Sequence, residues 1–203
     1  MNKKEHWENV FATKQETEVS WFQKSPKTSL DFIESIGVTK DAKIIDIGGG
    51  DSYLIDTLLK IGYTNLTLLD ISSNAIERIK KRLGDEAEKV TFIVSDILDF
   101  HPTKTYDFWH DRASFHFLTE QNQIKNYAAL VSKAIAKDGK MVIGTFSKNG
   151  PKKCSGLDIT QYNEATMKAI FYSDFEVIDC FTEDHNTPFD TVQNFIFCSF
   201  KKK

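Results

Sequence analysis

Short apolar runs alternate with helical patterns along most of the chain. The run over 43–47 is apolar apart from Asp46 and ends at three glycines, which is typical of a buried strand. A helical pattern follows over 53–61, then a second apolar run over 65–70 and a second helical pattern over 74–83. This alternation predicts a mostly parallel sheet with helices on both faces.

The second half of the chain continues this order and then departs from it. We expect strands over 90–94, 106–110 and 141–146, helices over 120–136 and 161–171, and two final strands over 175–181 and 194–200. Only a polar loop with Pro188 separates the last two runs, and strands joined without a helix usually pair antiparallel. The pattern therefore predicts five β–α units that are closed by a β–β pair.

A helical stretch over 4–36, which contains Trp7 and Trp21, precedes the first strand. No linker separates it from the rest, so we expect one domain over 1–203. Within it, residues 1–36 form a helical lid over the carboxyl edge of the sheet, and residues 40–203 form the α/β core.

Composition and net charge limit the classes of partner that we expect for this chain. The 203 residues fit one domain, and a formal net charge of −3 gives no field to hold a polyanion, so we expect no nucleic acid. No apolar run approaches the ~18 residues of a membrane span. Residues 1–11 carry charges and no apolar centre, which argues against a signal peptide. We expect a small-molecule partner and no membrane.

The three cysteines are Cys154, Cys180 and Cys198. Their number is odd and no C-x-x-C spacing occurs, which predicts neither a disulfide framework nor a zinc or other metal site. We therefore expect a reduced, cytoplasmic protein.

The first candidate site is the glycine loop after the first strand. Gly48, Gly49 and Gly50 follow a strand that contains Asp46, and such a loop lets the backbone approach a ligand closely. A dinucleotide site needs a small residue three positions after Gly50, where this chain has Tyr53. The loop therefore favours an adenosyl ligand over NAD.

Two further candidates follow the next two strands. Asp70 ends the second strand, where a carboxylate can accept both ribose hydroxyls, and Ile71 follows it in the same pocket. Asp96 ends the third strand and can accept from the adenine amine, while Ile97 offers an apolar flank and a backbone N–H.

These three sites, in this order, resemble the class I S-adenosylmethionine (SAM)-dependent methyltransferase superfamily over about residues 40–200. The usual third glycine of its motif is Ser52 here. The resemblance implies SAM as cofactor and a Rossmann-like α/β fold, with a seven-stranded, mostly parallel sheet and an antiparallel last strand.

A narrower resemblance spans nearly the whole chain. The segments HWENVF, EVSWF, WHDRASFHFL, CSGL and HNTPF look like those of a group of bacterial SAM-dependent methyltransferases with no settled substrate. The N-terminal stretch is also similar to that of some eukaryotic elongation-factor lysine methyltransferases, whose segment after strand four differs.

Aromatic faces stabilise a sulfonium cation. We assign Trp21 to the cofactor pocket and Trp109, inside a strand, to the core. For Trp7 both interpretations stay open.

The catalytic candidates follow from where strand four ends. Parallel strands end at the ligand crevice, which puts His110, Asp111 and Arg112 beside the sulfonium. Asp111 holds the methionine amino group or takes a proton; Arg112 holds a carboxylate or pairs with Asp111. His116 is a candidate base, whereas we favour a structural role for His110.

Two loops complete the predicted acceptor pocket or simply pack against it. Cys154 lies beside Lys152 and Lys153, and nearby cations lower a thiol pKa; His185 lies in the loop before the last strand. The function we expect is methyl transfer to a small molecule. The alternatives are a protein lysine methyltransferase, a SAM-binding module without catalysis and, less favoured, an NAD-dependent oxidoreductase.

Overall fold

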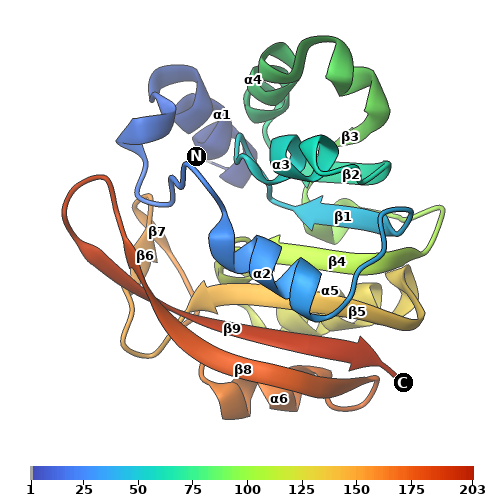
Figure 1. Ribbon diagram of the computed structural model, residues 1–203. Coiled ribbons are helices and arrows are strands. Elements are labelled where there is room, and N and C mark those ends of the chain that lie inside the picture. The colour runs from blue at the N-terminus through green and yellow to red at the C-terminus, as the bar shows by residue number, and fades with distance from the viewer. Residues whose placement is uncertain (1) are drawn as a thin grey trace.

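The computed structural model describes residues 2–203 and contains one large mixed sheet (Figure 1). Its seven strands lie in the order β3-β2-β1-β4-β5-β9-β8. They are β1 (Lys43–Ile47), β2 (Asn65–Asp70), β3 (Val90–Val94), β4 (Tyr106–Arg112), β5 (Ile135–Phe146), β8 (Phe175–Asn186) and β9 (Val192–Lys202). The last strand, β9, pairs antiparallel with both of its neighbours, while β1 to β5 pair in parallel. The predicted Rossmann-like α/β fold is confirmed.

Helices cover both faces of the sheet. The α-helices are α1 (Lys3–Thr13), α2 (Lys27–Ser35), α3 (Leu54–Lys60), α4 (Ser73–Leu83), α5 (Gln121–Ala134) and α6 (Glu164–Phe171). Short 3-10 helices are η1 (Glu16–Glu18), η2 (Gly84–Lys89), η3 (Ile97–Asp99) and η4 (Phe115–Phe117). Side chains of α2, α3 and α4 share one buried cluster with Ile44, and side chains of α5 and α6 share another with Ile45 and Ile47. The two faces thus alternate residue by residue along β1.

Several boundaries differ from the prediction because strand pairing continues beyond the apolar pattern. β4 runs on to Arg112, which is paired with Gly144 of β5, and β5 begins at Ile135, where we expected helix. The long β8–β9 pairing extends both last strands. A small hairpin, β6 (Lys153–Cys154) with β7 (Leu157–Asp158), was not predicted.

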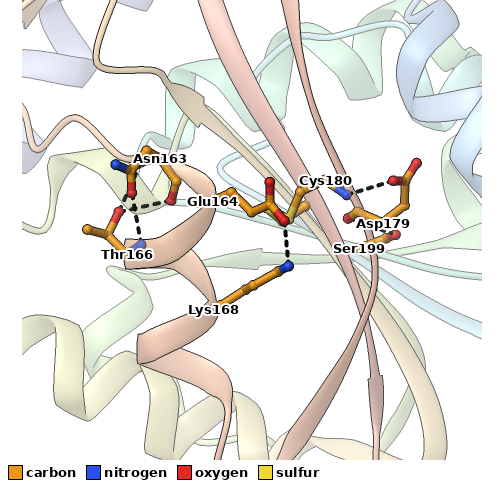
Figure 2. The surroundings of a disulfide bond; sticks show 8 residues. Asn163, Glu164, Thr166, Lys168, Asp179, Cys180 and Ser199 are labelled. Atoms are coloured by element: carbon orange, nitrogen blue, oxygen red, sulfur yellow. Dashed lines mark hydrogen bonds and ion pairs between the residues drawn. A yellow bond between two sulfur atoms is a disulfide. The ribbon is translucent and has the colours of Figure 1, made fainter.

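The last two strands also carry a disulfide between Cys180 and Cys198, so the prediction of reduced cysteines without a disulfide is wrong. The two residues are direct cross-strand partners, with their Cα atoms 4.2 Å apart. Figure 2 shows Cys180 next to Asp179, whose carboxylate accepts from the Cys180 backbone N–H at 2.9 Å. Only the register of the hairpin brings the two sulfurs together, and the sequence spacing did not reveal it. The cytoplasmic location, which rested partly on reduced cysteines, stays a prediction.

The predicted lid has two parts in the structure, and its residue 1 lies outside the described part of the chain. α1 lies against α4 at the edge where the parallel strands end (Figure 1). α2 instead packs on the face of the sheet, where Phe32 and Ile33 join the buried cluster around Ile44. Among the helices of residues 2–203, none is long and apolar enough to cross a membrane.

One carboxylate fastens α1 to the rest of the fold. Glu8 accepts from the backbone N–H groups of Ser73 (2.8 Å) and Asn74 (3.0 Å) at the start of α4, and from the Ser72 hydroxyl (2.7 Å). Burial raises the pKa of Glu8, but the hydrogen bonds from Asn74, Ser73 and Ser72 outweigh it and lower the pKa to about 2. The dipole at the N-terminus of α4 also stabilises the negative charge of Glu8, so it acts in the same direction as these hydrogen bonds.

We expect Glu8→Gln to lower the free energy of unfolding by about 1 kcal/mol at pH 7, because it removes a charged acceptor from a partly exposed helix cap. The folded-state pKa lies below the ordinary 4.5, so this stabilisation is present above pH 4.5 and is lost as the pH falls toward 2. Urea unfolding at pH 7 and pH 4 measures the difference, which shrinks at pH 4. The control Glu88→Gln changes an exposed carboxylate that makes none of these contacts; an equal loss in both variants would contradict the account.

Candidate functional site

A cavity opens where β1 to β4 end, beside the point at which the strand order reverses between β1 and β4. The parallel strands direct their carboxyl ends to this edge, and residues from α1, α2 and η4 enclose it from the other side. Its walls include Lys3, Trp7, Phe11, Trp21, Ser29, Asp46, Gly48, Gly49, Gly50, Asp70, Ile71, Ser95, Asp96, Ile97, His110, Arg112, Ala113, Ser114, Phe117, Leu118 and Cys154.

The glycine loop forms the floor at the end of β1. Gly48 has φ 60°, and a Cβ there would lie 2.7 Å from the Ser114 side chain. At Gly49 a Cβ would lie 2.4 Å from Asp46 Oδ2. Larger residues would therefore displace neighbouring groups or fill the cavity floor. Arg82, which the sequence analysis missed, binds the far side of this loop by donating to the carbonyl oxygens of Asp51 (2.8 Å) and Ser52 (2.7 Å).

Two carboxylates stand in a row at the ends of β2 and β3. Asp70 accepts from the backbone N–H groups of Gly50 (2.9 Å) and Ser72 (2.8 Å), and burial raises the pKa of Asp70 to about 7. Asp96 accepts from the Leu98 backbone N–H at 2.9 Å. Ile71 and Ile97 line the cavity beside them. The structure thus brings all the predicted nucleoside-binding residues to one wall.

A buried hydrogen-bonded chain crosses the cavity wall from β1 to α2. Asp46 Oδ1 lies 2.7 Å from His110 Nδ1, and His110 Nε2 lies 2.8 Å from the Ser29 hydroxyl. An ionised carboxylate only accepts, so we assign the ring proton to Nδ1, which leaves Nε2 to accept from Ser29. Asp46 Oδ2 is buried and has no partner within residues 2–203. The sequence favours a structural role for His110 and does not indicate Ser29, since only the packing of α2 brings the Ser29 hydroxyl to this wall.

Arg112 reaches the same cavity from the end of β4. Its Nη1 donates to the Trp21 carbonyl oxygen at 3.3 Å, and its guanidinium lies 5.5 Å from the centre of the Phe195 ring. Burial lowers the pKa of Arg112 to about 10, so the side chain stays charged at neutral pH.

Cys154 also lines the cavity, but the neighbouring lysines do not activate its thiol. Burial raises the pKa of Cys154 to about 12, outweighing the nearby charge of Arg112. The flanking Lys153 points away, to an exposed ion pair with Asp158 at 3.2 Å. Burial, and not Lys152 or Lys153, therefore sets the pKa of this thiol.

Asp111, predicted to bind the cofactor or take a proton, does not line the cavity. Side chains alternate along β4, so His110 and Arg112 share the cavity side while Asp111 faces the opposite side of the sheet. There it accepts from the backbone N–H groups of Ser114 (3.1 Å) and Phe115 (2.9 Å) and from the Tyr127 hydroxyl (2.7 Å). Asp111 thus holds the turn that follows β4.

His116, the predicted base, is also outside the cavity. Its ring is buried against Phe117 and Phe146, with centroids 4.5 and 4.8 Å away. Burial lowers the pKa of His116 to about 3, so the ring is neutral, and its position indicates a packing role.

The tryptophans divide as the sequence suggested. Trp21 and Trp7 both line the cavity, with ring centroids 5.7 Å apart. Trp109 is buried on the far side of β4 and donates to the Tyr127 hydroxyl at 3.0 Å. His185 does not line the cavity; its Nε2 lies 2.8 Å from the Ser20 carbonyl oxygen, which ties the segment before Trp21 to β8.

No group of three or more metal-binding side chains that could hold an ion occurs within residues 2–203.

Solved structures share this architecture. The N-methyltransferase NodS of Bradyrhizobium japonicum, solved with S-adenosyl-L-homocysteine (SAH), superposes with a TM-score of 0.75 at 13% identity and covers 99% of each chain. A SAM-dependent methyltransferase of Anabaena variabilis gives a TM-score of 0.75 at 13% identity, covering 100% of this chain and 96% of the other.

Curated relatives match the sequence over part of their length. A malonyl-[acyl-carrier protein] O-methyltransferase of Ilyobacter polytropus is 30% identical over 111 residues, which are 54% of this chain and 40% of that protein. An EEF1A lysine methyltransferase of Danio rerio is 23% identical over 155 residues, which are 69% of this chain and 66% of that protein. The chain therefore spans less than two thirds of the length of either relative.

The family described as "Methyltransferase domain" matches residues 38–191, from just before β1 to the β8–β9 turn, and so includes the glycine loop, Asp70 and Asp96. This chain belongs to that methyltransferase family.

Proposed function

We propose that this protein binds SAM and transfers its methyl group to the sulfur, nitrogen or oxygen atom of a small molecule. The observation that carries the proposal is the row of partners along one edge of the sheet. Asp96, Asp70 and the glycine loop lie at the ends of β3, β2 and β1 in turn. This order matches the adenine, ribose and methionine parts of an adenosyl ligand.

Two features of the cavity fit this cofactor. A Cβ at Gly48 or Gly49 would collide with Ser114 or Asp46 and so distort the cradle that the glycine loop forms, and Asp46 Oδ2 is a buried acceptor without a partner in the described chain. The methionine ammonium group supplies the donor and the positive charge that this oxygen lacks. Asp70 accepts from the ribose hydroxyls, and Asp96 with Ile97 holds the adenine.

Bound SAM supplies an electrophilic methyl group on a sulfonium cation. The faces of Trp21 and Trp7 line the cavity and stabilise a cation there, while the aromatic wall excludes water. Much of the acceleration of such an in-line displacement comes from holding the acceptor in position.

An acceptor that must lose a proton needs a base, and the Ser29–His110–Asp46 chain takes the place that we first gave to His116 and Asp111. The acceptor proton moves to Ser29 Oγ while the Ser29 hydroxyl proton moves to His110 Nε2. Asp46 then stabilises the resulting imidazolium across its 2.7 Å hydrogen bond.

A protein lysine is the second candidate acceptor. The similarity to the Danio rerio relative and to an eEF1A lysine and N-terminal methyltransferase of Mus musculus, 26% identical over 125 residues, favours it. That match covers 59% of this chain and 17% of the mouse protein.

We also propose that the protein is cytoplasmic and that it belongs to the bacterial group of methyltransferases that its sequence segments resemble.

We expect Asp70→Asn to raise the dissociation constant for SAH by about 10- to 100-fold, because a charged acceptor of the ribose hydroxyls is lost. Isothermal titration calorimetry measures the constant, and the thermal midpoint checks that the variant is folded. Asp99→Asn, an exposed change nearby, should bind as wild type does. Equal SAH affinity in Asp70→Asn and wild type would remove the ribose assignment.

We expect Ser29→Ala and His110→Asn to slow turnover about 100-fold or more, since they break the proton path, while SAH affinity stays within threefold. The readout is SAH formed from SAM in the small-molecule fraction of an extract of the source cells. Ser35→Ala removes a hydroxyl from the same helix on its exposed side and serves as the control. Unchanged turnover in Ser29→Ala would exclude the relay.

A further inference from the structure

The guanidinium of Arg112 has no anionic partner within residues 2–203. No carboxylate lies within ion-pair distance, and its one hydrogen bond runs to the Trp21 carbonyl oxygen at 3.3 Å. A guanidinium has five N–H donors, so most of them are unused. Placing an unpaired charge in a largely buried site costs free energy unless a ligand supplies the partner.

The nearest acidic side chains are already engaged elsewhere. Glu183 accepts from the Thr28 hydroxyl at 2.6 and 2.9 Å, and Asp46 binds His110. Asp111, the neighbour in sequence, faces the other side of the sheet and is bound by Tyr127. None of the three is arranged to neutralise Arg112 directly, although Glu183 and Asp46 attract it over a longer range.

The position of Arg112 separates it from the proposed nucleoside wall. That wall runs along the ends of β3, β2 and β1, whereas Arg112 ends β4, the next strand in the sheet. Its neighbours there are Phe195 of β9, Trp21 and Cys154. The immediate neighbours of the guanidinium are therefore mostly apolar, and the polar Ser29–His110–Asp46 chain lies on the same face of the sheet. We assign this part of the cavity to the acceptor.

We infer that the acceptor is a small organic acid whose carboxylate is bound by Arg112. The planar guanidinium matches a carboxylate with two parallel N–H···O bonds, and the surrounding aromatic and thiol groups suit an apolar carbon skeleton. One guanidinium with mostly apolar immediate neighbours fits one carboxylate better than a more highly charged phosphate. The inference rests on the proposed function and names the substrate class for that site.

The test begins with the protein saturated with SAH, which first shows that the cofactor site works. Benzoate, phenylacetate and cinnamate are then titrated by calorimetry, each beside its neutral primary amide. We expect at least one acid to bind at least tenfold more tightly than its amide. Arg112→Gln should abolish this preference, and Arg112→Lys should retain part of it, because the charge stays but the two-point contact is lost. Lys152→Gln removes an exposed positive charge in the loop after β5 and should change nothing.

SAH binding to the variants distinguishes whether Arg112 binds the carboxylate of the acceptor or the methionine carboxylate of the cofactor. SAH affinity within threefold of wild type in Arg112→Gln, together with loss of acid binding, supports the acceptor site. A tenfold or larger loss of SAH affinity would assign Arg112 to the methionine carboxylate of the cofactor and overturn the inference. Equal binding of acids and amides, or no binding of any acid to the SAH complex, would overturn it as well. Failure of wild type to bind SAH would instead reject the proposed function.

Discussion

The pairing of β4 between β1 and β5 is the constraint on which the rest of the site depends. Pairing with β1 fixes the strand through Asp111 and pairing with β5 fixes it through Arg112, so its side chains must alternate between the two faces of the sheet. Alternation sends His110 and Arg112 to the cavity and Asp111 to the core. The same register places His110 opposite Asp46 of β1, which brings their side chains within hydrogen-bond distance. One pairing thus sets the positions of His110 and Arg112 at the cavity and of Asp111 at the following turn.

The helices and the connecting segment that precede the sheet complete the cavity wall to which β4 contributes. α2 packs on the face shared by His110 and Arg112 and delivers the Ser29 hydroxyl to the imidazole. The segment between α1 and α2 brings the Trp21 carbonyl oxygen within hydrogen-bond distance of Arg112, and Glu8 binds α1 to the start of α4. The lid is therefore held by hydrogen bonds to β4 and to the start of α4, which follows β2. In the proposed function the cofactor and the acceptor occupy one cavity, which is what direct transfer between two ligands requires.

The sequence predicted those features that depend on local order. Gly48 to Gly50, Asp70 and Asp96 could be placed because each follows a strand that the apolar pattern identifies. The roles of Asp111 and His116 were misplaced because strand four was ended at residue 110, which made Asp111 part of a loop. Ser29 and the Cys180–Cys198 disulfide were missed because each depends on contacts between segments far apart in the chain. The rise of the Cys154 pKa had the same origin, since burial and not its lysine neighbours decides it.

The central claim is that the cavity at the carboxyl edge of this sheet transfers a methyl group from SAM to a small molecule. The most direct measurement uses SAM labelled in its methyl group, purified protein and an extract of the source cells, followed by separation of protein from small molecules. The account predicts label in the small-molecule fraction with wild type and, at a SAM concentration near the wild-type dissociation constant, much less label with Asp70→Asn. Label confined to a protein band would contradict the small-molecule acceptor and favour a protein lysine, and no enzyme-dependent label in either fraction would contradict methyl transfer itself.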